Sequence, residues 1–404
     1  MDPGMHPPLI LEVSDPEAGL TGWLAVDSLV DDHFCGGIRM LPDVTPLELA
    51  ELAKAMTWKH AFLGIPHGGA KAGILYGEAA SKEEKGRLLA AFGRKIRNLL
   101  EDRVYLPGSD MGTTEQDIRG MFRALGLRVP KRALAGGNSG WYTGLTVVAG
   151  ARVASTFQGL DLTRATVAIE GFGAVGSSVA QGIERLGSRV VAISTSQGAL
   201  YSPEGLHVAG LLEGARRHGS RVVDFYDRAD RLNRESLLEL DVDVLMPCAR
   251  HHSIHMDNVS RIQARVISSG ANAPVAGEAD GVLSQRGILC VPDFVSNAGG
   301  VLGGTMEFAG LSRSAISGFV ETDFSRQVFL LIERARKEGV PIRQLAEAVA
   351  MDRFTRIKRA SENRSVGKRA FSFALRLYRN GAIPKALVGA LARKYFQQRI
   401  NGRL

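Results

Sequence analysis

The spacing of apolar and polar residues changes along the chain, and this spacing predicts which segments are strands and which are helices. In the first third, strand-like runs at 22–26 and 103–107 are mixed with helical stretches. The helical stretch 45–63 has the clearest start, because Thr45 is suited to cap its N-terminus, a proline follows, and Glu48 stands three residues after the cap. The pattern therefore predicts an α/β first third with a well-capped helix.

The middle third has the pattern of a parallel sheet. Residues 165–195 contain an apolar strand-like run, a glycine turn, a helical stretch and a second β-branched run. Three later apolar runs end at Cys248, Asn272 and Asp293. Strands that alternate with helices are typical of a doubly wound parallel sheet, which binds ligands at the carboxyl ends of its strands. We therefore expect these three residues to face one crevice.

Composition indicates a globular protein of at least two domains. The 404 residues exceed the size at which a single core usually stops growing. Three cysteines, Cys35, Cys248 and Cys290, are too few and too scattered for a disulfide framework or a zinc site, so a reducing cytoplasm and no metal are expected. The N-terminus has no basic segment before a long apolar run, and no run reaches the length of a membrane span, so we expect no membrane association.

The segment GFGAVG is the clearest binding motif. Gly171, Gly173 and Gly176 follow a predicted strand and begin a predicted helix, with Ala174 and Val175 between them. In a dinucleotide-binding fold such glycines make the turn, let a pyrophosphate approach the backbone and allow close helix packing. An ordinary tight turn between strand and helix is the alternative.

The residues after this loop leave the choice between NAD and NADP open. A carboxylate about twenty residues further on would hold the adenosine ribose of NAD. The second strand ends instead at Thr195, which does not repel a 2′-phosphate. Arg250, His251 and His252 are candidate phosphate partners, with ordinary solvated loop residues as the alternative.

Two lysines stand in an otherwise apolar and glycine-rich stretch. Lys59 falls near the end of the predicted helix 45–63, and Lys71 lies among glycines further on. The simpler interpretation is that both lay their stems along apolar surface and keep their amines in water. The alternative is a site that uses them, because an unpaired buried ammonium is costly or loses its proton.

Together these motifs resemble the glutamate/leucine/phenylalanine/valine dehydrogenase superfamily. The matching stretches lie in order over roughly residues 20 to 310: GGIRM (36–40), MTWKHA (56–61), PHGGAKAGI (66–74), PGSDMGTTEQDI (107–118), the dipeptide at 143–144, the glycine loop, GAN (270–272) and PDFVSNAGGV (292–301). The resemblance implies reversible NAD- or NADP-dependent oxidative deamination of an L-amino acid to a 2-oxo acid and ammonia. It also implies a homo-oligomer, since hexamers and octamers are usual in the family.

The resemblance assigns roles to individual positions. Lys59 matches the lysine that binds the substrate α-carboxylate, Lys71 the catalytic lysine and Asp110 the acid that shuttles a proton to and from the amino group. Further matches line the substrate pocket or surround the nicotinamide and its ribose, at Gly36, Gly37, Thr143, Asn272 and Asn297.

The family fold implies a Rossmann-type doubly wound parallel sheet domain at 144–321. An α/β N-terminal substrate-binding and oligomerisation domain at 1–143 would be completed by C-terminal helices at 322–364. The remainder, 365–404, is predicted to be a basic helical extension, because residues from Asp352 onward carry fourteen basic and two acidic side chains. A helical pair packed on the substrate domain or at a subunit contact is favoured, and binding of nucleic acid through this extension is the alternative.

Cys35 departs from the pattern of glutamate-specific members. These members carry a lysine just before the GG of the first motif, where it pairs with the substrate side-chain carboxylate. A thiol behaves as a small hydrophobe, so an apolar substrate of the leucine, valine or phenylalanine type is expected. Three alternatives stay open: a catalytic thiol at Cys35, a glutamate enzyme that uses Arg39 or His33, and a non-catalytic homologue that binds the cofactor or a partner.

Overall fold

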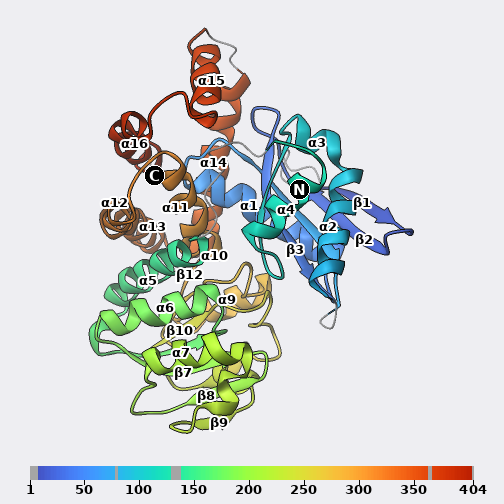
Figure 1. Cartoon of the computed structure of the whole chain (residues 1–404). Helices are drawn as coiled ribbons and strands as arrows, with labels where there is room; N and C mark the ends of the chain where they lie inside the picture. Colours follow the sequence, from blue (N-terminus) through green and yellow to red (C-terminus); the bar gives the residue numbers. More distant parts are fainter. Residues whose placement is uncertain (1–7, 78–80, 129–137, 363–365, 403–404) are drawn as a thin grey trace. The chain divides into compact units, whose positions relative to one another are not determined.

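The computed structural model describes residues 8–77, 81–128, 138–362 and 366–402, which form two compact units (Figure 1). Within these described residues, the units divide as follows. Unit 1 takes its residues from Met1–Gly137, Glu307–Gly310 and Val349–Arg399, and unit 2 from Asn138–Met306, Leu311–Ala348 and Ile400–Leu404.

Unit 1 is built on a five-stranded mixed sheet. Its strands, in sheet order, are β1 (Leu9–Asp15), β2 (Leu20–Val26), β4 (Gly68–Leu75), β3 (Phe34–Leu41) and β5 (Tyr105–Ser109). β3 runs parallel to both β4 and β5, whereas β2 is antiparallel to β1 and β4. The helices that pack on this sheet are α1 (Pro46–Phe62), α2 (Lys82–Lys95), α3 (Arg97–Glu101) and α4 (Glu115–Ala124).

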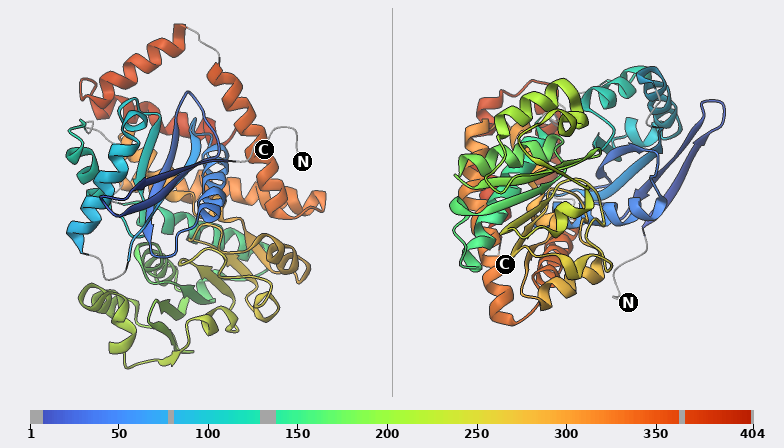
Figure 2. Two further views of the ribbon diagram at one scale, coloured as in Figure 1. Left: turned by 90° about the vertical axis from the view of Figure 1, so that its right-hand side faces the viewer. Right: turned by 90° about the horizontal axis from the view of Figure 1, so that it is seen from below.

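The two faces of this sheet are covered differently. On one face, side chains of α2 and α4, among them Phe92 and Met121, pack with strand residues such as Ile38 into the main core of the unit. On the other face, α1 packs Leu49 and Ala53 against Ala25 of β2 (Figures 1 and 2). Burial of these apolar side chains fixes the register of the strands, because a slip of one residue would exchange the two faces.

Helix α1 begins and ends close to the predicted positions. The Thr45 hydroxyl accepts a hydrogen bond from the Glu48 backbone N–H at 3.2 Å, and a proline occupies the first helical turn. The local capping signals therefore suffice to place this helix. Its last turn carries Lys59 and His60.

Unit 2 contains a seven-stranded sheet of the Rossmann type, as predicted. Its strands, in sheet order, are β12 (Leu289–Val291), β11 (Val266–Ser268), β10 (Val244–Pro247), β6 (Thr166–Glu170), β7 (Arg189–Thr195), β8 (Gly198–Tyr201) and β9 (Asp230–Leu232). β12 to β7 are parallel, and β8 and β9 are added antiparallel at one edge. The helices of the unit are α5 (Ser139–Phe157), α6 (Ala174–Arg185), α7 (Val208–His218), α8 (Val222–Phe225), α9 (Gly277–Gln285), α10 (Asp293–Ser296), α11 (Gly299–Phe308), α12 (Arg313–Phe319) and α13 (Ser325–Glu338).

The strand ends differ from the predicted ones. β10, β11 and β12 stop one, four and two residues before Cys248, Asn272 and Asp293. The largest difference has a local cause, because the backbone after β11 turns and leaves Ala273 with a positive φ of 46°. The Ala273 N–H donates to the Asp293 carboxylate at 2.9 Å, so this turn is fixed by a side chain.

The predicted domain boundaries also differ from the two units. The boundary after residue 143 falls inside α5, and 322–348, assigned to the substrate domain, belong to unit 2 because α13 packs on α5. Helix α14 (Ile342–Glu362) runs from unit 2 into unit 1. The C-terminal segment forms two helices, α15 (Val366–Arg379) and α16 (Lys385–Ile400).

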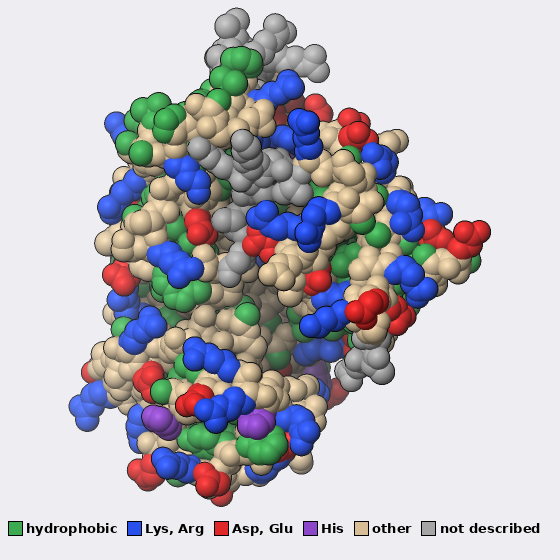
Figure 3. Space-filling view, viewed as in Figure 1, with side chains coloured by type: hydrophobic (Ala, Val, Ile, Leu, Met, Phe, Trp, Pro, Cys, Tyr) green, Lys and Arg blue, Asp and Glu red, His purple; other side chains and the backbone are tan. Residues whose placement is uncertain are grey.

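None of the described helices is long and apolar enough to span a lipid bilayer. On the face of the molecule shown in Figure 3, basic and acidic side chains are interspersed over the surface of unit 2. Nucleic-acid binding through the basic extension remains a prediction, as does a cytoplasmic location.

Candidate active site

Three candidate residues of unit 1, Cys35, Gly37 and Lys71, lie on the sheet face that α1 covers. Cys35 of β3 stands opposite Gly69 of β4, and Lys71 stands opposite Ala25 of β2. Because alternate residues of a strand share one face, Cys35 and Gly37 face the same way as Lys71. A Cβ at Gly69 would collide with the backbone of α1, so the glycine allows this helix to lie close above the strand.

Lys71 belongs to a buried ionic network. Its Nζ pairs with Oδ2 of Asp110, and a terminal nitrogen of Arg39 lies 3.3 Å from Oδ1 of the same carboxylate. Arg39 pairs in addition with Glu48 of α1. The Met111 backbone N–H donates to Oδ1 of Asp110 at 2.5 Å. The four charged side chains are at most 8% exposed, so their charges are balanced inside the protein.

Both lysines singled out in the sequence are buried, so their interpretation as solvated surface residues is wrong. Lys71 is 3% exposed, and Lys59, in the last turn of α1, is 6% exposed. Burial lowers the pKa of Lys71 well below its ordinary value, and the positive charges of Arg39 and Lys59 lower this pKa further, against an opposing effect of Glu48. The amine of Lys71 can therefore exchange a proton closer to neutral pH than an ordinary lysine.

Two glycines bring β3 close to the ends of its neighbours. A Cβ at Gly37 would lie 2.8 Å from the Ser109 carbonyl oxygen and 2.9 Å from the Cβ of Asp110. A Cβ at Gly36 would collide with the backbone of β4, and the carbonyl of Gly36 accepts a hydrogen bond from the Tyr105 hydroxyl at 2.9 Å. Any side chain at Gly37 would therefore displace Asp110.

Cys35 is half-buried and carries a neutral thiol. Burial raises its pKa to about 12, although the nearby Lys71 acts in the opposite direction. A thiol with this pKa is protonated at neutral pH, whereas the nucleophile in cysteine catalysis is the thiolate. The geometry therefore disfavours the alternative of a catalytic thiol at Cys35.

The glycine motif of unit 2 forms the predicted turn between β6 and α6. Gly171 has a φ of +87°, which favours glycine, and a Cβ at Gly176 would collide with the Gly171 carbonyl oxygen. A Cβ at Gly173 would meet no described atom within 4 Å. No described side chain caps the first turn of α6, which contains Ala174 and Val175. Uncapped N–H groups at a helix start suit an anion such as a pyrophosphate.

A second part of unit 2 offers an open hydrogen-bond acceptor. The Asn297 amide nitrogen donates to the Ala271 carbonyl at 2.8 Å and to Oδ1 of Asn272 at 3.0 Å. Oδ1 of Asn297 is buried and has no hydrogen-bond partner among the described residues. Thr143 is buried in α5. Gly300 of α11 packs close to it, since a Cβ at Gly300 would lie 3.0 Å from Oγ1 of Thr143. An unpaired buried amide oxygen fits a ligand that donates an N–H.

Two family models match most of the chain. The description "Glutamate/Leucine/Phenylalanine/Valine dehydrogenase" matches residues 138–364, and "Glu/Leu/Phe/Val dehydrogenase, dimerisation domain" matches residues 8–126. The chain belongs to this dehydrogenase family. It is an NAD(P)-dependent amino-acid dehydrogenase, an oxidoreductase acting on CH–NH2 groups.

Its relatives include enzymes named for glutamate. The glutamate dehydrogenase of Thermotoga maritima is 40% identical over 295 residues, which are 70% of each chain. NAD-specific glutamate dehydrogenase A of Halobacterium salinarum is 34% identical over 70% of this chain and 67% of its own. Among solved structures, the hetero-hexameric glutamate dehydrogenase of Thermus thermophilus in its leucine-bound form is 30% identical, with a TM-score of 0.76 over 88% of this chain and 92% of that one.

In this dehydrogenase the Thr195 hydroxyl hydrogen-bonds to nearby backbone groups. Its hydroxyl donates to the Ser220 carbonyl at 2.7 Å and accepts from the Gln197 N–H at 3.1 Å. Thr195 is the last residue of β7, and the residues of the turn to β8 contain no carboxylate. The turn therefore does not repel a 2′-phosphate.

The structure brings together groups that no local sequence pattern connects. Arg39, an alternative ligand for a glutamate side chain, is bound by Glu48 and Asp110. The sequence pattern assigns Glu48 to the start of α1, whereas in the fold its carboxylate also pairs with Arg39. The local pattern does not show this pairing, because the packing of α1 on the sheet brings the partners together.

Within the described ranges, no three His, Cys, Asp or Glu side chains are placed to hold a metal ion.

Glu170 is a further residue that the motifs did not reveal. It is the last residue of β6, directly before the glycine loop, and is 4% exposed. Burial raises its pKa to about 7, although the Ser253 hydroxyl donates to its Oε2 at 3.0 Å. A protonated carboxyl is therefore more stable here than in water.

Replacing Glu170 with glutamine is expected to stabilise this dehydrogenase at pH 8 but not at pH 4. The folded state holds a proton that the unfolded state releases at lower pH, so the wild type loses stability as the pH rises from about 4.5 through 7. The full difference corresponds to roughly 3 kcal/mol as an upper figure. Urea unfolding of wild type and variant at both pH values measures the change in the free energy of unfolding. An equal change at pH 4 and pH 8 would contradict the raised pKa of Glu170.

Proposed function

We propose that this dehydrogenase catalyses the reversible oxidative deamination of an L-amino acid with an apolar side chain to the 2-oxo acid and ammonia. The observation that carries this choice is the neutral thiol of Cys35 on the same sheet face as Lys71. A side-chain carboxylate next to Cys35 would be desolvated without a counter-charge there. Arg39 does not fill this role, because its guanidinium pairs with Glu48 and Asp110.

The residues of unit 1 supply binding and proton handling in this proposal. Lys59, which is buried in the last turn of α1, binds the substrate α-carboxylate. Lys71, with its lowered pKa, acts as a base near neutral pH and activates the water that attacks the imine. Asp110 exchanges a proton with the substrate nitrogen, and Arg39 and the Met111 N–H hold its carboxylate in place.

Gly36 and Gly37 let β3 lie close to β4 and to Asp110, because side chains there would collide with the Ala70 carbonyl and with the Cβ of Asp110. Lys71 and Asp110 already form an ion pair, so one proton can be shared between amine and carboxylate. The protein thereby holds both proton-transfer groups at one point on the sheet before substrate arrives.

The residues of unit 2 are proposed to hold the dinucleotide, which when bound accepts hydride from the substrate Cα. The N-terminal turn of α6 would bind the pyrophosphate, and Thr195 lies where the adenosine ribose is expected. The open amide oxygen of Asn297 would accept from the nicotinamide carboxamide, with Asn272 and Thr143 near the adjoining ribose. Both NAD and NADP are compatible with the Thr195 turn.

Glutamate is the second candidate substrate. It is favoured by the relatives named glutamate dehydrogenase, one of which is 40% identical to the chain. Binding of a side-chain carboxylate would then need a cation other than a lysine at position 35. A homo-oligomer, a hexamer or octamer, is proposed on the basis of the family, and light scattering of the purified protein tests it.

An amino-acid panel with NAD and NADP, followed by reduced-nicotinamide absorbance, distinguishes these candidates. Leucine, valine or phenylalanine should give a higher kcat/KM than glutamate. The variant Cys35→Lys should raise the ratio of kcat/KM for glutamate over leucine by roughly 10- to 100-fold, because it supplies the missing cation. Cys35→Ser, which adds no charge, is the matched control. A wild-type preference for glutamate would refute the apolar assignment.

A further inference from the structure

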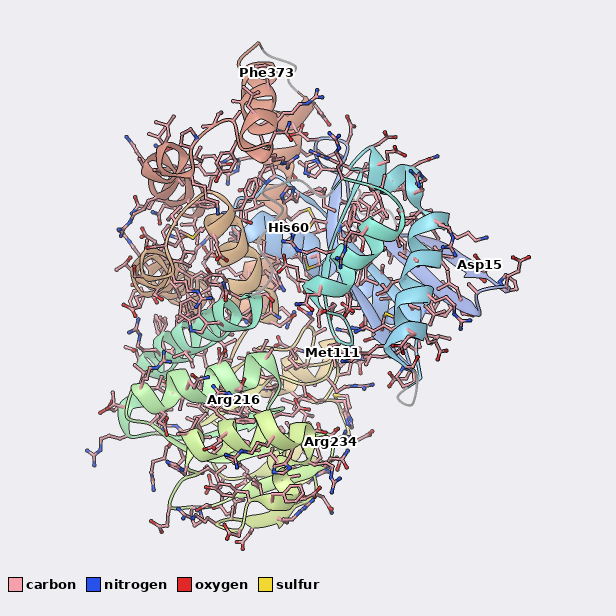
Figure 4. The ribbon with its side chains drawn as sticks, viewed as in Figure 1. Asp15, His60, Met111, Arg216, Arg234 and Phe373 are labelled. Atoms are coloured by element: carbon pink, nitrogen blue, oxygen red, sulfur yellow. The ribbon has the colours of Figure 1, made fainter. Side chains whose placement is uncertain are left out.

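Arg343, near the start of α14, belongs to a cluster of charged side chains within unit 2. Its guanidinium nitrogens lie 2.8 Å from Oδ1 of Asp293, 3.6 Å from Oδ1 of Asp280 and 3.7 Å from Oε1 of Glu347. The side chain of Arg343 is only 19% exposed, and that of Asp293 is 4% exposed. Other arginines of the same unit are exposed, among them Arg216 and Arg234 (Figure 4).

The charge of Arg343 is maintained by its neighbours. Burial lowers its pKa, but the carboxylates of Asp293 and Asp280 outweigh this effect and raise the pKa above its ordinary value. Burial is also the main cause that raises the pKa of Asp280, against an opposing effect of Arg343. The almost fully buried carboxylate of Asp293 therefore has a permanent cationic partner.

Asp293 connects Arg343 to the turn that follows β11. Its Oδ1 accepts a hydrogen bond from Arg343, and its Oδ2 accepts from the Ala273 N–H at 2.9 Å. Ala273 has a φ of +46°, which residues with a Cβ rarely adopt. The Ala273 carbonyl accepts from the His252 N–H at 2.8 Å, so backbone holds one side of the turn and the Asp293 carboxylate the other. Arg343 thus fixes the direction in which Asp293 supports this turn.

The same turn orients the amide of Asn297. Nδ2 of Asn297 donates to the Ala271 carbonyl at 2.8 Å and to Oδ1 of Asn272 at 3.0 Å, the two residues before Ala273. The Asn297 backbone N–H donates to the Asp293 carbonyl at 2.8 Å. Because the amide nitrogen has two hydrogens and both are used, Oδ1 is left as an acceptor. This oxygen is buried, and no described residue pairs with it.

We propose that Arg343 is a positioning residue for the nicotinamide end of the dinucleotide, because it holds Asp293 against the turn that aims Oδ1 of Asn297. This inference rests on the proposed function, which places the nicotinamide carboxamide at Asn297. Arg343 itself does not touch the ligand. It acts through an acceptor that is aimed in advance, and such an acceptor binds its donor more tightly, because less ordering remains to be done on binding.

Removal of the guanidinium would leave the Asp293 carboxylate buried without its cation. Such a carboxylate takes up a proton or turns toward another donor. Its hydrogen bond to Ala273 then weakens, and the strained backbone at this residue relaxes. The amide of Asn297 loses its fixed acceptors as a result. The first turn of α6, which is proposed to bind the pyrophosphate, is not part of these contacts, so the loss should be confined to the nicotinamide.

Calorimetric titration of Arg343→Met with two ligands tests the proposal. The first ligand is NADH or NADPH, whichever the wild type binds more tightly. The second is ADP-ribose or its 2′-phosphate, which has the same adenosine and pyrophosphate but no nicotinamide. The Kd of the dinucleotide should rise about tenfold, as expected for one lost hydrogen bond, and that of ADP-ribose should change by less than about twofold. Equal weakening of both ligands would show that Arg343 only supports the fold of unit 2, and would overturn the proposal.

A second substitution tests whether Arg343 acts through the turn. Glycine adopts a positive φ without strain, so Ala273→Gly added to Arg343→Met should recover about threefold in dinucleotide affinity. No recovery would overturn the proposal. Arg343→Lys keeps the charge and serves if Arg343→Met does not fold. It should weaken the dinucleotide about threefold and leave ADP-ribose unchanged, since lysine lacks the planar fork; equal changes for both ligands would again count against the proposal.

Arg334→Met is the matched control. It removes an exposed arginine of unit 2 that pairs with Glu338 within α13, and both Kd values should be unchanged. Asn297→Ala separates this inference from the proposed function. If Asn297→Ala weakens only the dinucleotide and Arg343→Met weakens neither ligand, the inference fails and the nicotinamide site stands. If neither variant alters the difference between the two ligands, the proposed nicotinamide site fails together with the inference.

Discussion

Replacing Lys71 with methionine is expected to lower kcat by roughly 10³-fold, within the range in which general acid–base groups contribute. Methionine has a similar length but cannot take or release a proton. The pKa of Lys71 is lowered mainly by burial, so wild-type activity should rise with pH and level off well below the ordinary lysine value of 10.5. The variant should lose this pH dependence. Reduced-nicotinamide absorbance at saturating amino acid, measured across pH, follows both effects.

The matched control is Lys85→Met, which removes a lysine of unit 1 that pairs with Asp117 of α4. It should keep near wild-type kcat. Dinucleotide affinity, measured by fluorescence titration, should be unchanged in both variants. A Lys71→Met enzyme that retains more than about a tenth of the wild-type kcat would show that another group handles the proton.

Replacing Asp110 with asparagine is expected to lower kcat by roughly 10²-fold. Asparagine nearly preserves the shape of the side chain, and its oxygen can still accept from the Met111 N–H and Arg39. It cannot exchange a proton with the substrate nitrogen. Loss of the nearest anion also destabilises the ammonium of Lys71, so the acid limb of the pH–rate profile should move to lower pH.

Asp117→Asn is the control for this variant. Asp117 is an acid of unit 1 that caps α4 and pairs with Lys85. Its replacement should leave the profile in place. An acid limb of Asp110→Asn that stays at the wild-type pH, with kcat little changed, would mean that the carboxylate serves only to hold the fold.

Features with local causes were predictable from the sequence. The start of α1 follows from the hydroxyl of Thr45 and the N–H of Glu48, three residues apart. The glycine loop follows from backbone conformations that Gly171 and Gly176 permit and other residues do not. These signals depend on neighbours in the chain, which a single sequence displays.

Features that depend on distant neighbours were not predictable. Arg39 and Asp110 are 71 positions apart in the sequence, and His33 and His67 are 34 positions apart. A local sequence pattern therefore cannot predict that these side chains are in contact. The amphipathic pattern of α13 shows that one face is buried but not which unit buries it. Helix α13 packs on α5, and for this reason the predicted domain boundary differs from the observed one.

The separation of Cys35 from the ionic network has a consequence for how such enzymes diversify. Cys35 is level with Gly69, two residues before Lys71 on the neighbouring strand, and no hydrogen bond joins it to Lys71, Asp110 or Arg39 in the described part of the chain. A substitution at position 35 can thus change which amino-acid side chain is accepted without breaking the ion pairs of Lys71, Asp110 and Arg39. A charged residue there would reach the proton chemistry only through its electrostatic effect on Lys71.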